Sequence, residues 1–280
     1  MLSRRALLAS CTAALAAQSL TAMAAAKPDL WPRWQAQDPA SSQRVDHAPW
    51  SAFLERHVSE HADGVNRLAY GRVDAAEKAR LDAYVVALAA TPVTQLNRNE
   101  QRAFWINLYN ALTVKTVLAA YPVKSIRDIK ISPGLFASGP WGKKLVRIEG
   151  EEISLDDIEH RILRPIWKDP RTHYAVNCAS IGCPNLPREA FTPATMNALL
   201  DAGARAYANH PRGAEIKDGK LVTSSIYVWF QDDFGGGDAG VIAHLKRYAK
   251  PEFAAALASV STIASDRYDW SLNDAGAGRS

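Results

Sequence analysis

Residues 99–122 read NEQRAFWINLYNALTVKTVLAAYP, and this stretch decides the fold. Apolar side chains fall on nearly every face of a helix built from it, so the sequence predicts a helix that is buried all round. The helix begins at Asn99 and must end before Pro122, because the residue before a proline is disfavoured in helical geometry. We expect it to be the central helix of the molecule.

Helical spacing recurs on both sides of this stretch. Further helices are predicted at 47–60, 74–90, 154–167, 192–209, 224–234 and 238–248. Asp74 and Asp238 are the expected N-caps of two of them, because a carboxylate can accept the free N–H groups of a first turn. Ser154 and Asp157 form a variant of the capping box at the start of a third.

Strand patterns are short and fewer than the helices. A hairpin is predicted at 143–154 with Glu149 and Gly150 at its turn, and another at 214–223. THYAVN, residues 172–177, is predicted to be a buried strand, since it is short, aromatic and β-branched. The pattern as a whole predicts a single α+β domain that is mostly helical, with a central buried helix and short antiparallel strands.

The two ends of the chain differ from this pattern. Residues 1–26 have a basic start with Arg4 and Arg5, then an Ala- and Leu-rich stretch and small residues, which is the layout of a cleaved signal peptide. We therefore expect a periplasmic or secreted protein, exported by the twin-arginine or the general secretory route. Residues 27–46 should form an extended arm, 47–274 the domain and 275–280 a disordered tail.

Composition excludes several classes of protein. The formal net charge of +4 over 280 residues is too small to indicate a nucleic-acid partner. After the first 26 residues no stretch approaches the ~20 apolar residues of a membrane span, so no transmembrane span is expected in the mature chain. No motif indicates a cofactor, and none is expected.

The stretch HYAVNCASIGCPNLP, residues 173–187, holds the two cysteines that remain after removal of the signal peptide. An even number of cysteines in an exported chain favours a disulfide between Cys178 and Cys183. A nucleophilic Cys178, activated by a nearby imidazole, is the second interpretation. There is no second cysteine pair at zinc-ligand spacing, so a metal site is not expected.

Two histidines are candidates for the base of such a nucleophile. His160 has Asp156 one helical turn earlier and Glu159 beside it, and a carboxylate at that spacing can hold an imidazole. His173 lies in the predicted strand, where alternation would place it and Cys178 on opposite faces. That favours His160 as the alternative base.

Asn107 and Asn110 are three residues apart and share one face of the predicted buried helix. A buried amide without partners costs roughly 1–3 kcal/mol, so both side chains must hydrogen bond to something specific. The favoured interpretation is that they hold the backbone of a neighbouring loop. The alternative is that they orient a catalytic group or bind substrate.

Five blocks in order, FWINLYNALTVK, SLDDIEHRILR, HYAVNCASIGCPNL, SSIYVWFQDDFG and YDWSLN, resemble the family called domain of unknown function 547 (DUF547). The resemblance runs from about Trp50 to Asn273. It implies a papain- or transglutaminase-like fold and thiol chemistry, although the buried helix carries Asn107 where such a fold has its cysteine. It also marks a set of residues: Asn107, Asn110, Glu159, His160, His173, Cys178, Cys183, Asp233 and Asp269.

Two hypotheses follow. In the first, the protein is a cysteine hydrolase or acyl transferase of peptide or amide substrates, in which Cys178 attacks and a histidine takes the proton. Glu159 or Asp269 would then orient the histidine, and Asn107 or Asn110 would stabilise the oxyanion.

In the second hypothesis, the protein is a non-catalytic binding module of the cell envelope. Its partner would be a peptide or an envelope ligand, and Cys178 and Cys183 would form a structural disulfide. A bridged pair favours this hypothesis, and a free, fast-reacting Cys178 favours the first.

Overall fold

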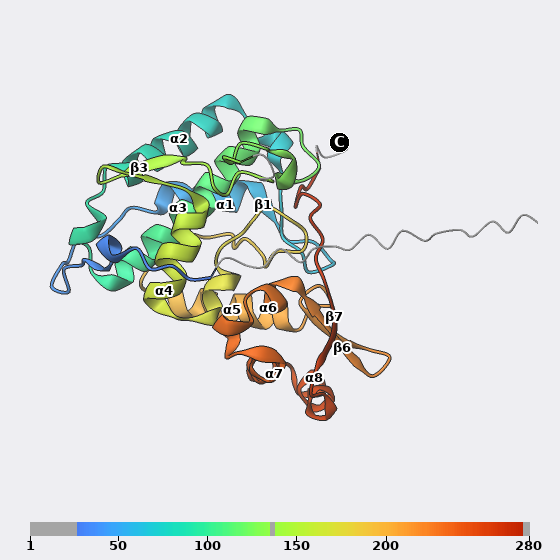
Figure 1. The fold of residues 1–280 in the computed structure, drawn as a ribbon. Helices are drawn as coiled ribbons and strands as arrows, with labels where there is room; N and C mark the ends of the chain where they lie inside the picture. The colour runs from blue at the N-terminus through green and yellow to red at the C-terminus, as the bar shows by residue number, and fades with distance from the viewer. Residues whose placement is uncertain (1–26, 135–137, 277–280) are drawn as a thin grey trace, which may run out of the picture.

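A computed structural model describes residues 27–134 and 138–276; the expected signal peptide and residues 277–280 of the expected tail lie outside the described residues. The long helix α3 (Arg98–Ala120) runs through the middle of the larger lobe (Figure 1). Asn97 caps it by accepting the N–H groups of Asn99 and Glu100. Nearly every side chain from Glu100 to Leu118 is buried, so the predicted all-round burial is confirmed.

Short elements surround α3 in this lobe. They are α1 (Ala48–His57), β1 (Val58–Ser59), β2 (Arg67–Leu68), η2 (Tyr70–Arg72), α2 (Ala75–Ala89), η3 (Val93–Gln95), η4 (Ile126–Asp128), β3 (Val146–Ile148), β4 (Glu151–Ile153), η5 (Asp157–Leu163) and α4 (Arg164–Trp167). Asp74 caps α2, and Ser154 and Asp157 exchange the expected pair of capping hydrogen bonds. The hairpin of β3 and β4 turns at Glu149 and Gly150 as predicted.

The arm that precedes α1 packs on the larger lobe. It carries one turn of 3-10 helix, η1 (Pro32–Gln35), and the ring of Trp34 within it is buried. Trp34 meets Trp105 of α3 edge to face, with 5.0 Å between the ring centroids. Burial of such rings contributes to the hydrophobic core, which explains why a polar, proline-rich segment lies against the lobe.

A second lobe follows in the C-terminal part, with its own buried apolar cluster that includes Tyr207, Tyr227 and Leu245. Its elements are α5 (Met196–Ala208), β5 (Ala214–Lys217), β6 (Lys220–Ser224), α6 (Ser225–Trp229), η7 (Gln231–Phe234), α7 (Gly237–Tyr248), α8 (Pro251–Ala256), η8 (Leu257–Ser259) and β7 (Ile263–Arg267). β5 and β6 form the predicted antiparallel hairpin. β7 was not predicted, and it pairs with β6 in parallel.

Three sequence-based assignments are wrong in the described residues. Residues 172–177 form no strand, because Asp169 accepts the N–H of Arg171 and starts the 3-10 helix η6 (Pro170–Tyr174). A short apolar run cannot be told from a buried helical turn by its pattern alone. The helix predicted at 224–234 is broken into α6 and η7, and Asp238 lies inside α7, where it accepts from Gln231 instead of capping.

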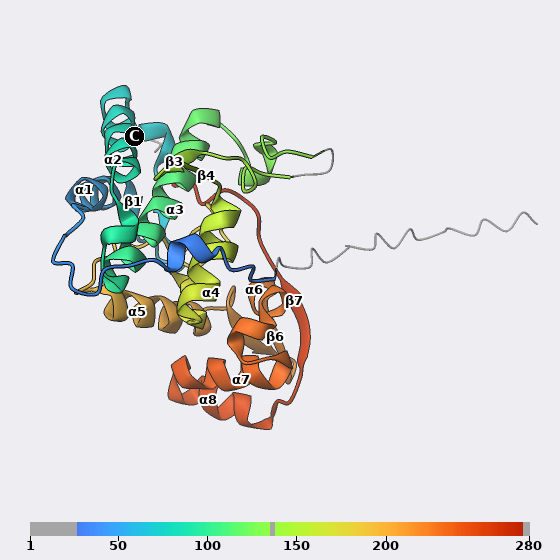
Figure 2. The ribbon, with the colours of Figure 1, turned by 60° about the vertical axis from the view of Figure 1, so that its left-hand side comes forward.

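Two segments join the lobes. Tyr174 packs in the cluster of the second lobe, whereas Ala175 and Val176 pack in that of the first. After β7 the chain runs back along both lobes (Figure 2), and the N–H of Leu272 donates to Lys124 O at 2.8 Å. The segment with both cysteines therefore lies where the two lobes meet.

The structure confirms the predicted class, a mostly helical α+β domain with small sheets. In the residues that it describes, no helix is both long and apolar enough to cross a membrane.

Candidate thiol site

The loop that carries the cysteines, residues 177–183, is held by asparagine side chains. Asn110 of α3 accepts the N–H of Asn177 at 2.8 Å and donates to Ala175 O at 2.9 Å. Asn177 in turn donates to Pro184 O at 2.7 Å and accepts the N–H of Ala179 at 2.9 Å. Because each of these groups is buried, their pairing fixes the path of the loop.

Cys178 lies half-buried at the start of this loop and is surrounded by donors. Its N–H donates to Cys183 Sγ at 3.2 Å. Its Sγ lies 3.3 Å from Ser180 Oγ and 2.9 Å from the hydroxyl of Tyr268. The two hydroxyls are 2.9 Å apart, so the thiol and both hydroxyls form a small hydrogen-bonded triangle.

The two thiols differ in their acidity. A hydrogen bond from Cys183 lowers the pKa of Cys178; burial opposes this, and the Ser180 and Tyr268 hydroxyls support it. Burial raises the pKa of Cys183, and its contact with Cys178 adds to the effect. Of the two sulfurs, Cys178 is therefore the one that ionises more readily.

Both cysteines are thiols in this structure, with no disulfide between them. Cys183 is buried and can donate to Val176 O at 3.7 Å, while Cys178 is partly exposed. Among the residues that the structure describes, no group of three or more His, Cys, Asp and Glu side chains could hold a metal ion.

His173 is held by carboxylates and a phenyl ring. Its Nε2 lies 2.7 Å from Asp233 Oδ2, its Nδ1 lies 3.8 Å from Glu159 Oε1, and its ring stacks on Phe230 at 4.2 Å. Arg164 Nε donates to the same Asp233 oxygen at 2.5 Å. Burial opposes the charge of Asp233, but these two donors outweigh it and lower the pKa of Asp233 to about 2.

His160 lies in η5, which has π-helical geometry. Its Nε2 lies 3.8 Å from Asp156 Oδ1, the pairing that the sequence predicted, and its Nδ1 lies 3.0 Å from Arg164 Nη1. In the part of the chain that the structure describes, neither His160 nor His173 hydrogen bonds to the thiol of Cys178. The structure thus brings the histidines to the carboxylates and not to the sulfur.

Glu159 lies between the histidine network and the thiol in its electrostatic effect: it is near His173, and its charge acts on Cys178. Its Oε2 accepts the hydroxyl of Tyr109 at 3.1 Å, and burial, together with the charge of Glu159, raises the pKa of Tyr109. The same negative charge opposes ionisation of Cys178. Glu159 therefore acts on the thiol as a nearby anion and not through a shared hydrogen bond.

The two helix asparagines are both engaged with backbone. Asn107 donates to Phe191 O at 2.7 Å and accepts the N–H of Phe191 at 3.0 Å. Asn110 makes the equivalent pair with Ala175 and Asn177. These contacts are those of the loop-holding interpretation: each amide gives one N–H to a backbone oxygen and accepts one backbone N–H, and both side chains are buried.

Sequence reasoning missed the aromatic neighbours of the thiol. Tyr268 lies 4.6 Å from Trp270 and 5.0 Å from Trp229, and Trp141 lies 5.7 Å from Trp270, measured between ring centroids. All four rings are partly exposed, and the Arg127 guanidinium lies 5.3 Å from the centroid of the Trp270 ring. We call Trp141, Trp229, Tyr268 and Trp270 the aromatic group.

The block YDWSLN could have drawn attention to this group, but sequence reasoning singled out Asp269 within it. Asp269 is exposed; its Oδ1 accepts the N–H of Ser271 at 2.8 Å, and its backbone oxygen accepts the N–H of Gly182. Neither histidine contacts it in the described residues. The side chain that contacts the thiol is the preceding one, Tyr268.

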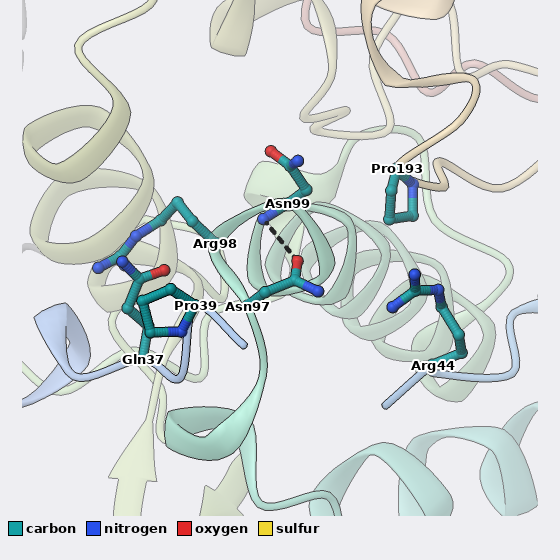
Figure 3. Close-up of a pocket in the computed structure, with 7 residues that line it drawn as sticks. All are labelled: Gln37, Pro39, Arg44, Asn97, Arg98, Asn99 and Pro193. Atoms are coloured by element: carbon teal, nitrogen blue, oxygen red, sulfur yellow. Dashed lines mark hydrogen bonds between the residues drawn. The ribbon is translucent and has the colours of Figure 1, made fainter. Parts of the chain in front are cut away.

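The hollow in Figure 3 lies away from these residues. It has a volume of about 450 Å³ and is lined by Gln37, Pro39, Arg44, Asn97, Arg98, Asn99 and Pro193. Arg98 is used to hold Trp34 O and Gln35 O, and Arg44 pairs with Glu100. Its cations are therefore engaged in structural contacts, and it contains none of the candidate residues.

Comparison with known proteins gives one match. The model of a family described as protein of unknown function, DUF547, matches residues 93–208. No curated protein and no solved structure matches the chain. The matched region contains α3, η5, both histidines and both cysteines, and it ends before Tyr268 and Asp233.

Proposed function

Because this chain belongs to the DUF547 family through residues 93–208, and the function of that family is unknown, we propose a function from the site itself. The protein is a thiol-dependent hydrolase or acyl transferase that acts on peptide or other amide substrates. The observation that carries this proposal is the environment of Cys178. Its thiol is half-buried, and hydrogen bonds from Cys183, Ser180 and Tyr268 lower its pKa. Such donors favour the thiolate, which is the nucleophilic form.

The chemistry assigns one role to each neighbour. The Cys178 thiolate attacks the carbonyl carbon of the substrate, and the C–N bond of the resulting tetrahedral adduct breaks to give a thioester. Tyr268, whose hydroxyl lies 2.9 Å from Cys178 Sγ and which burial and the nearby thiols keep protonated by raising its pKa, donates a proton to the leaving amine and takes one back from the water or amine that attacks next. Water or an acceptor amine then attacks the thioester, which releases the acyl group and restores the thiol.

The histidines are positioning residues in this proposal. His173, Asp233 and Arg164 form a buried charged network beside Phe230, and Glu159 links it to Tyr109. The network sets the electrostatic field around Cys178 through Glu159 and holds η5 against η7. The hydroxyls of Ser180 and Tyr268 are the donors nearest to the sulfur, in place of the amides of Asn107 and Asn110.

A second candidate function is a non-catalytic binding module of the cell envelope. The observation that favours it is the absence, in the described residues, of a histidine hydrogen-bonded to Cys178, together with the backbone hydrogen bonds that both helix asparagines make. The aromatic group would then be the binding surface for a peptide or envelope ligand. Aromatic rings with one exposed face are common in such surfaces.

The two functions can be separated with an activated ester, p-nitrophenyl acetate. The acyl-transfer proposal expects Cys178 to become acetylated, as located by peptide mass, and expects p-nitrophenol release to fall to the background rate in Cys178→Ser. Cys183→Ser is the matched control and should still be acetylated at Cys178. No acetylation, or equal release by Cys178→Ser, would support the binding module.

Export is a separate proposal, and it rests on the sequence of residues 1–26. Cleavage would follow Ala24 or Ala26. The mass of the protein recovered from the periplasm tests it: the expected mass lacks the first 24 or 26 residues, whereas the full-length mass in the cytoplasm would contradict it.

A further inference from the structure

The cysteine loop brings its two sulfurs together within one tight turn. Four residues separate Cys178 from Cys183 in the sequence, and the N–H of Cys183 donates to Ser180 O at 3.1 Å to close the turn. Cys183 Sγ accepts the N–H of Cys178 at 3.2 Å, so the second sulfur lies against the backbone of the first cysteine. The two sulfurs are thus neighbours, as a reversible bond between them requires.

The pair is asymmetric in exposure. Cys178 is partly exposed, whereas Cys183 is 3% exposed and therefore buried. An incoming molecule can reach the first sulfur and not the second. In thiol–disulfide exchange this is the arrangement in which one thiol attacks and the other resolves the mixed disulfide.

We propose that the protein also exchanges disulfides with peptide disulfides, Cys178 being the sulfur that attacks and Cys183 the sulfur that resolves. In the first step the Cys178 thiolate attacks one sulfur of the peptide disulfide. The S–S bond of the peptide breaks, a mixed disulfide forms, and the first peptide thiol leaves with the proton that Cys178 lost.

In the second step Cys183 loses its proton and attacks Cys178 Sγ. The mixed disulfide breaks, the second peptide thiol leaves with that proton, and a Cys178–Cys183 disulfide remains. The peptide disulfide is reduced and the cysteine pair is oxidised, so the electrons balance without another reactant. The reverse reaction, with two peptide thiols, restores the dithiol.

The surroundings of Cys178 fit a peptide as the carrier of this disulfide. Tyr268 touches the sulfur, and Trp270 and Trp229 extend from it as partly exposed rings that can pack against a peptide chain. The guanidinium of Arg127 is exposed beside Trp270 and can pair with a peptide carboxylate. This proposal shares with acyl transfer only the nucleophilicity of Cys178, so either can fail alone.

The test uses the full chain, in which the third cysteine, Cys11 of the expected signal peptide, is replaced by serine in every sample so that only the pair can react; wild type here means that Cys178 and Cys183 are both present. The reduced protein is mixed with oxidised glutathione, a peptide disulfide, quenched with acid and alkylated before its mass is measured. Wild-type protein should lose both alkylation sites and release two glutathione thiols. Cys183→Ser should stop at a glutathione adduct on Cys178, and Cys178→Ser should react at least ~10-fold more slowly.

The wild-type result needs no substitution at Cys178 or Cys183 and therefore does not depend on the folding of a variant of the pair. A stable glutathione adduct on wild-type protein, without the internal disulfide, would overturn the resolving role of Cys183. Equal rates for Cys178→Ser and Cys183→Ser would overturn the attacking role of Cys178, provided that both variants melt near the wild-type temperature. The first outcome leaves acetylation of Cys178 by p-nitrophenyl acetate unaffected, because acyl transfer does not use Cys183; after the second, the acetylation assay shows separately whether acyl transfer also fails.

Discussion

The hydroxyl of Tyr268 lies 2.9 Å from Cys178 Sγ, although 90 residues separate the two in the sequence. The approach is fixed by backbone, because the N–H groups of Ile181 and Gly182 donate to Ser271 O and Asp269 O, both at 2.8 Å. A Cβ atom at Gly182 would lie 2.7 Å from the N atom of Asp269, so glycine is needed for this contact. The acidity of the thiol therefore depends on the returning C-terminal segment.

Tyr268→Phe should slow the reaction of Cys178 with iodoacetamide at neutral pH by about threefold to tenfold. The reason is the loss of one hydrogen bond to the thiolate, which raises the pKa of Cys178. Peptide mass spectrometry gives the rate at Cys178 alone. Tyr121→Phe is the matched control, because Tyr121 donates to Asp274 and makes no contact with the cysteines. Equal alkylation rates in the two variants would contradict the claim that the Tyr268 hydroxyl lowers the pKa of Cys178.

Glu159→Gln should have the opposite effect and speed the same reaction by about twofold to tenfold. The carboxylate opposes the thiolate charge, so its removal lowers the pKa of Cys178, while the amide can still accept from Tyr109. The measurement is the pH midpoint of alkylation. Glu100→Gln, in the first turn of α3, is the control and should leave the pH midpoint of Cys178 alkylation unchanged. An upward shift in Glu159→Gln would contradict the electrostatic role.

Asp233 should make stability depend on pH. Its pKa is about 2 in the folded protein and about 3.9 in an unfolded chain, so its ionised form stabilises the fold by about 2–3 kcal/mol above pH ~4. This stability is lost as the pH falls through the folded value. The free-energy difference between wild type and Asp233→Asn, from urea unfolding, should therefore shrink from pH ~4 to pH ~2. Asp232→Asn, at an exposed neighbour, should show no such change.

Asn110→Ala should lower the free energy of unfolding by about 2–5 kcal/mol, because it leaves the buried Asn177 N–H and Ala175 O without partners. Asn99→Ala in the same helix is exposed and should cost less than ~0.5 kcal/mol. Urea unfolding at neutral pH measures both. A similar small loss at both positions would mean that Asn110 does not hold the cysteine loop.

The buried helix, the caps at Asp74 and Ser154 and both hairpins could be predicted, because each has a local signature. β7 could not, since its residues are mostly exposed and its parallel partner is β6, which lies about 40 residues earlier. The turn at Pro170–Tyr174 was mistaken for a strand because hydrophobic pattern alone does not separate the two in so short a run.

The sequence predicted which residues lie in the site better than it predicted which of them contact one another. The pairing of Asp156 with His160 follows from helical spacing, and so does the shared face of Asn107 and Asn110. The neighbours of Cys178 do not follow from spacing, because Tyr268 reaches it only through the return of the chain after β7. His173 was placed by a strand that does not exist, and its true partner Asp233 is 60 residues away.

The central claim is that Cys178 is an activated thiol. The most direct test is the rate of iodoacetamide alkylation as a function of pH, resolved for each cysteine by peptide mass in the same reduced sample. The account predicts that Cys178 reacts with a midpoint below the ordinary thiol value of about 8.5 and that Cys183 reacts with a higher midpoint and more slowly. A midpoint for Cys178 at or above the ordinary value, or one shared by both cysteines, would contradict it.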